Sequence, residues 1–120
     1  GFIGSPAMNL IDGTLTDGVF EAEGVRIEGL PRLARGPVTL GYRAEDASVT
    51  QADGQIAAPI YSLELLGDAT MVTVRIAGGE LAAVRAPKEY RAGIGEGVRF
   101  AIPPGICHLF DRESGRRLAA

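Results

Sequence analysis

Two neighbouring residues near the end of the chain, Cys107 and His108, are of the types that form a nucleophilic thiolate–imidazole pair. Such a pair works only where the two side chains meet. Both stand in a short apolar segment, residues 106–110, that favours a β-strand, and adjacent side chains of a strand point to opposite faces. We therefore expect no catalytic dyad, but a buried apolar thiol at Cys107 and a packed or hydrogen-bonded imidazole at His108.

Charged residues gather at two further places. Glu45 and Asp46 are adjacent carboxylates close to Arg43, a group that suits acid–base work or a metal, or else a solvated turn with a local ion pair. The solvated turn is the commoner arrangement. Near its end the chain carries a small basic group, which suits a phosphate or protein contact or a solvated tail: Arg112, Arg116 and Arg117.

Nucleotide and metal chemistry lack their usual motifs. A phosphate-binding loop needs a fixed glycine pattern before a Lys and a Ser or Thr, whereas the only lysine, Lys88, follows Pro87. The single cysteine excludes an internal disulfide and a cysteine-based zinc site. We predict no catalytic residue, no bound cofactor and no metal in this chain.

The apolar pattern is that of short strands separated by glycine turns. Turns are predicted at Asp12-Gly13 and Asp17-Gly18, and a two-residue hairpin at Gly78-Gly79. Alternation predicts six side chains facing the interior: Val72, Val74, Ile76, Val98, Phe100 and Ile102. Because no window has a long 3.6-residue apolar stripe, we expect an all-β fold, a small barrel or sandwich.

Composition agrees with a folded domain. Apolar residues make up 46% and charged residues 22% of 120 residues, and no apolar run is long enough to span a bilayer. The net charge is −3, so a nucleic-acid partner is disfavoured. Because the chain begins at Gly1 without a methionine, we expect a piece of a longer protein.

Four segments together resemble the maltose/glycerol-3-phosphate class of ABC importer ATPases. GFIGSPAMN at 1–9 is similar to the segment that follows the nucleotide-binding domain, and LGYRAED at 40–46 resembles a Leu-Gly-Ile-Arg-Pro-Glu-His motif. LELLGDATMVTVRI at 63–76 and IPPGICHLFDRESGRRL at 102–118 resemble later strands of the same family. Ala44 and Asp46 depart from the motif, whereas Arg43 and Glu45 are kept.

The resemblance implies a transport-associated OB-type (TOBE) domain of small β-barrels. Residues 1–9 would be the linker from a missing nucleotide-binding domain, and residues 10–120 the C-terminal regulatory domain. ATP and magnesium would bind the parent protein, on the cytoplasmic side of the bacterial inner membrane. The implied partners are a second ATPase subunit, the membrane permease subunits and a regulatory protein.

A two-fold contact between subunits requires a self-complementary patch. Two candidates are the Arg43–Glu45 turn, whose arginine can make forked hydrogen bonds, and the segment around His108 and Phe110. For Phe110 the alternative is that its ring is an ordinary part of the hydrophobic core and makes no contact with a partner. The alternative function is the sensing of a small oxyanion in a barrel mouth, for which the nearest polar side chains are those of Ser48, Thr50 and Arg43.

Overall fold

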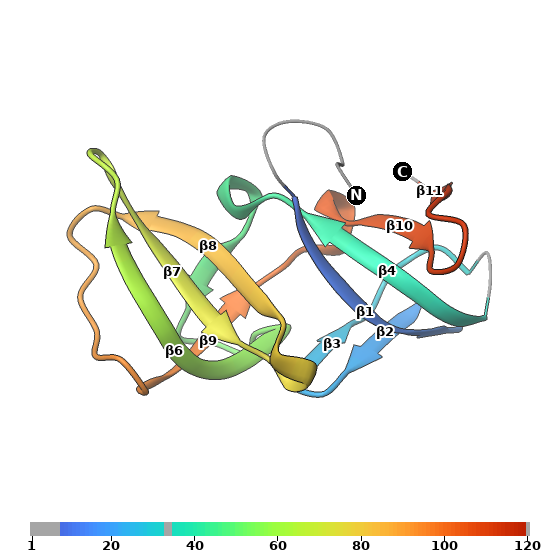
Figure 1. Cartoon of the computed structure of the whole chain (residues 1–120), viewed down its shortest axis with the longest axis horizontal. Helices are drawn as coiled ribbons and strands as arrows, with labels where there is room; N and C mark the ends of the chain where they lie inside the picture. Colours follow the sequence, from blue (N-terminus) through green and yellow to red (C-terminus); the bar gives the residue numbers. More distant parts are fainter. Residues whose placement is uncertain (1–7, 33–34, 120) are drawn as a thin grey trace.

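The computed structural model describes residues 8–32 and 35–119, and it confirms the all-β prediction. The described residues form eleven strands, three short 3₁₀ turns and no α-helix, and therefore no helix that could cross a membrane. Figure 1 shows two lobes side by side along the longest axis. Their apolar side chains join in one core cluster.

The first lobe is built from both ends of the described chain. Strands β1 (Asn9–Thr16), β2 (Val19–Ala22) and β3 (Val25–Ile27) form an antiparallel meander, and β4 (Gly36–Tyr42) pairs with the other edge of β1. After the second lobe the chain returns as β10 (His108–Asp111) beside β4, and β11 (Arg117–Ala119) pairs with β10. This return places residues 108–111 next to residues 38–41.

The second lobe contains the five strands between these segments. A 3₁₀ turn, η1 (Ala44–Asp46), leads from β4 to β5 (Ser48–Thr50), and β9 (Gly97–Ala101) lies between β5 and β6 (Ile56–Leu65). Strands β6, β7 (Ala69–Arg75) and β8 (Leu81–Pro87) form a continuous antiparallel ladder. Two further 3₁₀ turns are η2 (Ala77–Gly79) and η3 (Pro104–Ile106).

A polar junction ties the lobes together at the edge of β8. The Asn9 side chain accepts a hydrogen bond from the Ala83 N–H (3.1 Å) and donates to the Ala83 carbonyl (3.3 Å). The Tyr42 hydroxyl donates to the same carbonyl (3.0 Å). Two side chains of the first lobe thus take the place of a neighbouring strand at Ala83, and they satisfy backbone groups that an uncovered edge would leave unpaired.

Five of the six predicted core residues are buried, and Val98 is half-buried because it lies at the open end of the second lobe. The turn at Asp17-Gly18 is confirmed. The turn predicted at Asp12-Gly13 is wrong, because both residues lie inside β1. The lack of a side chain at Gly13 instead makes room for the ring of Phe20, since an added Cβ would lie 2.4 Å from that ring.

Two other details of the prediction differ from the structure. The β7–β8 connection is wider than a two-residue turn, because Ile76 donates to the Glu80 carbonyl across η2, although Gly78 and Gly79 both have positive φ. Arg117, for which the sequence favours a solvated tail, begins strand β11. Most of the expected linker at residues 1–9 lies outside the described residues; of its last two, Met8 contacts Gly41 and Asn9 begins β1.

Candidate interaction surface

The pairing of β4 with β10 brings three of the four predicted contact residues close to one another. His108 lies opposite Gly41, two residues before Arg43, which follows the end of β4 and precedes η1. Glu45 lies exposed on η1 itself. Residues 65 positions apart in the sequence therefore share one surface of the first lobe.

This surface is electropositive around His108. The Arg117 guanidinium, on β11, donates to His108 Nδ1. Burial lowers the pKa of His108, and the positive charges of Arg117 and Arg43 lower it further, while Asp46 opposes them. The imidazole is therefore neutral at pH 7 and accepts the arginine N–H. Arg117, which the sequence suggested to be part of a basic tail, belongs to this surface.

Phe110 differs from the other three residues. It is buried, and Arg117 lies over its ring at 5.8 Å from the centroid. Its aromatic ring thus packs against the Arg117 guanidinium and is not exposed for contact with a partner. Among the described residues Arg43 and Glu45 form no ion pair with each other, so the local pair expected for a solvated turn is not made.

Cys107 and His108 do not form a dyad. Cys107 is buried and its thiol donates to the Pro103 carbonyl at 3.5 Å, whereas the imidazole of His108 is half-exposed and contacts Arg117. Burial raises the pKa of the Cys107 thiol to about 11. The thiol is therefore protonated at neutral pH and is a poor nucleophile.

We expect Cys107 of the folded chain to resist a disulfide thiol reagent at pH 8, because both burial and the raised pKa suppress the thiolate. Addition of denaturant should expose the thiol and release one equivalent of chromophore rapidly. Rapid stoichiometric labelling without denaturant would show that the thiol is accessible and would contradict this assignment.

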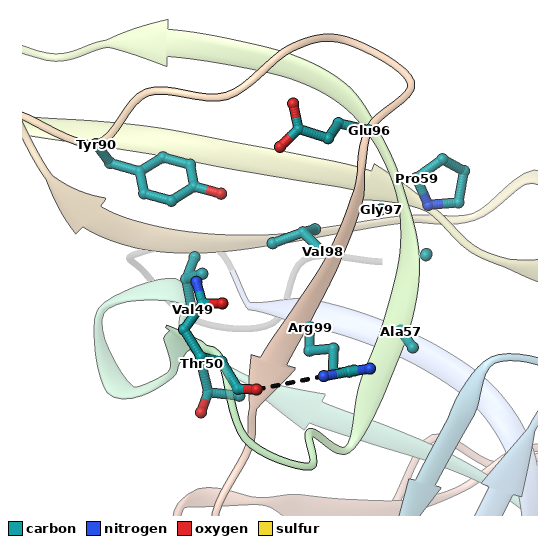
Figure 2. A pocket seen from close by; sticks show the side chains of 11 residues that line it. Val49, Thr50, Ala57, Pro59, Tyr90, Glu96, Gly97, Val98 and Arg99 are labelled. Atoms are coloured by element: carbon teal, nitrogen blue, oxygen red, sulfur yellow. Dashed lines mark hydrogen bonds between the residues drawn. The ribbon is translucent and has the colours of Figure 1, made fainter.

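A hollow with a volume of about 580 Å³ lies in the second lobe, at its open end (Figure 2). Its apolar part includes Tyr90, Val98 and Val49, and Glu96 lies at its rim. Arg99 reaches across to the backbone carbonyl of Gln51 at 3.3 Å. Of the polar residues proposed from sequence for ligand binding, only Thr50 lines this cleft.

The histidine, cysteine, aspartate and glutamate side chains of the described residues form no group that could hold a metal ion. Within residues 8–32 and 35–119 no three histidine, cysteine, aspartate or glutamate side chains converge on one point. Glu45 and Asp46 are exposed on a short 3₁₀ turn and belong to no metal-holding group of three such side chains in the described part of the chain. Acid–base chemistry at this pair has no support in the geometry.

Two family models match the chain. The model described as TOBE domain covers residues 40–110, and the one described as MalK OB fold domain covers residues 4–47. The cytoplasmic molybdate-binding protein ModG has a similar fold, with a TM-score of 0.69 at 15% identity, over 89% of this chain and 98% of that one. At this identity the likeness concerns the fold alone.

Curated relatives match almost the whole chain. The proteins named "sn-glycerol-3-phosphate import ATP-binding protein UgpC" from Ruegeria sp. and Paraburkholderia xenovorans are 35% and 37% identical, over 99% and 97% of this chain. The protein of that name from Salmonella typhi is 34% identical over 98% of it. The chain spans only about a third of the length of these relatives. Because the TOBE model matches more than half of the chain and the MalK OB fold model matches its first part, the chain belongs to the TOBE family of OB-fold domains.

Proposed function

We propose that this chain is the accessory domain of the ATP-binding subunit of an ABC importer for sugars, polyols or glycerol phosphate, and that it helps to hold two such subunits together. The match to import ATP-binding proteins over nearly all of the chain carries this proposal. The relatives are about three times as long, which leaves room for a separate ATPase domain.

The binding of ATP, the location at the membrane and the contacts with other subunits would be properties of the longer protein that we propose. ATP and magnesium would bind its ATPase domain, and the permease subunits would place it at the cytoplasmic side of the bacterial inner membrane. A regulatory protein is a further proposed partner. The net charge of −3 does not favour nucleic acid.

The proposed contact surface consists of Arg43, Glu45 and His108, with Phe110 as its buried support. Arg43 and His108 are both half-buried and lie near each other in the first lobe, and Arg117 adds a second guanidinium beside His108. Arginine makes paired hydrogen bonds with carboxylates, which suits contact with another protein. The concentration dependence of sedimentation should therefore show a weak monomer–dimer equilibrium, whereas a strictly monomeric chain at high concentration would contradict the pairing.

A second candidate function, the sensing of a small oxyanion, has one observation in its favour. The chain shares its fold with a molybdate-binding protein. The cleft of the second lobe fits this function poorly, because the Glu96 carboxylate repels an anion and Arg99 is directed at a backbone carbonyl. We therefore rank this function second.

Titration of the chain with magnesium-ATP should give no specific heat, because no phosphate-binding loop is present in its sequence. The matching control is an intact importer ATPase under the same conditions. A dissociation constant of about 1 µM, equivalent to about −8 kcal/mol, would contradict the assignment of ATP binding to another domain.

A further inference from the structure

The exposed large apolar side chains are distributed unevenly between the lobes. All five in the described part of the chain lie in the second lobe: Tyr61, Leu65, Leu66, Leu81 and Ile94. Leu65 and Leu66 are adjacent, at the tip of the β6–β7 hairpin, and are 64% and 40% exposed. Single exposed apolar residues are ordinary, whereas two adjacent exposed leucines form a small apolar patch that a partner could cover.

The hairpin tip, residues 64–68, is also acidic and well formed. Glu64 and Asp68 flank the two leucines, and both are exposed. The Leu66 N–H donates to the Ala69 carbonyl at 2.7 Å, which closes the turn, and Asp68 pairs with Arg85 at 3.0 Å. The tip therefore presents two leucines between two carboxylates with little conformational freedom to lose on binding.

The surface around His108 is complementary to the hairpin tip, because it is positively charged and partly apolar. Its arginines, Arg43 and Arg117, have no carboxylate partner among the ion pairs of the described residues. Its apolar part is supplied by Met8 and Leu10, both half-buried, whose side chains lie against Gly41 next to His108. It is thus an apolar surface edged by positive charge.

We infer that the hairpin tip of a second copy of this chain docks on the surface formed by Arg43, His108 and Arg117 with Met8 and Leu10. This inference rests on the proposed pairing of two subunits and names the residues that make it. Leu66 would pack against Met8 and Leu10, and Glu64 would pair with the arginines. Opposite charges at such a contact favour the correct register and accelerate encounter.

The arrangement closes with two-fold symmetry. In Figure 1 the tip of the β6–β7 hairpin lies at one end of the upper long edge of the molecule, while the end of β4 and the start of β10 lie nearer the middle of that edge. A half turn of a second copy about an axis between these two places brings each tip to the β4–β10 surface of its partner. Each copy then gives one tip and receives one, so the two contacts are identical, as a two-fold interface requires.

Leu66→Ser tests the apolar half of this contact, with Leu81→Ser as the matched control. Leu81 is 45% exposed, close to the 40% of Leu66, and lies in the same lobe at the other end of the β-ladder. In sedimentation equilibrium we expect Leu66→Ser to raise the dimer dissociation constant by at least about tenfold, as removal of a central contact residue does. Leu81→Ser should leave it unchanged.

A charge exchange tests the polar half. Arg43→Glu and Glu64→Arg should each weaken the dimer by about tenfold or more, and the double variant should recover most of that loss, because only paired residues compensate. Thermal unfolding checks that each variant still folds.

The outcomes separate the two claims. A dimer whose dissociation constant is unchanged by Leu66→Ser and Arg43→Glu would overturn the docking inference and leave the pairing of subunits standing. A double variant no tighter than the single ones would also overturn it. A strictly monomeric unmodified chain would contradict the proposed pairing, and the docking inference with it.

Discussion

Replacement of Phe100 by alanine should lower the free energy of unfolding by about 3–5 kcal/mol. Phe100 is fully buried, and its strand lies between β5 and β6, with Val49 and Ile56 opposite it. Truncation leaves a cavity that these two strands cannot close without breaking their ladders. Urea unfolding followed by circular dichroism measures the change.

Val98→Ala is the control for Phe100→Ala. Val98 belongs to the same strand but is half-buried at the open end of the lobe, so its truncation should cost less than half as much. A loss below about 1 kcal/mol for Phe100→Ala would show that its ring is not part of a packed core.

Asn9→Ala should destabilise the chain by about 1–3 kcal/mol, because it leaves the N–H of Ala83 without its partner at a half-buried position. The carbonyl of Ala83 keeps the Tyr42 hydroxyl at 3.0 Å, so the loss falls mainly on the N–H. Differential scanning calorimetry of the variant, with hydrogen exchange of the Ala83 amide, gives both the stability and its location.

Thr39→Ala provides the comparison for Asn9→Ala, since it removes an exposed side-chain hydrogen bond, to Asp12, at the surface of the first lobe. Its effect should be about 0.5 kcal/mol or less. Equal effects of the two substitutions would mean that the junction between the lobes contributes no more than an ordinary surface contact.

The fold class could be predicted from the sequence because a strand with one buried face has apolar residues at every second position. Val72, Val74 and Phe100 show this pattern, and all are buried. Gly13 was misread because a glycine that admits a neighbouring ring looks, in sequence, like a glycine that makes a turn. The division into two lobes depends on strand pairing between distant segments, which periodicity does not encode.

The candidate surface was predicted in part. Arg43 and His108 were named from motifs, and the pairing of β4 with β10 explains why motifs so far apart belong together. Arg117 was taken for part of a tail because β11 is short and its neighbours are polar. The role of Asn9 was missed because its partner, Ala83, carries no polar side chain, so no sequence signal marks the contact.

The measurement that tests the account most directly is a concentration series of amide NMR spectra of the ¹⁵N-labelled chain, from about 10 µM to about 1 mM, the range of weak association. If the chain is a pairing domain, the amide signals of Arg43, His108, Arg117, Leu65 and Leu66 should shift together with concentration. Signals around the cleft at Thr50 and Arg99 should stay fixed. Spectra independent of concentration, combined with shifts at Thr50 and Arg99 on addition of molybdate, would contradict the pairing of subunits and identify a ligand-sensing domain instead.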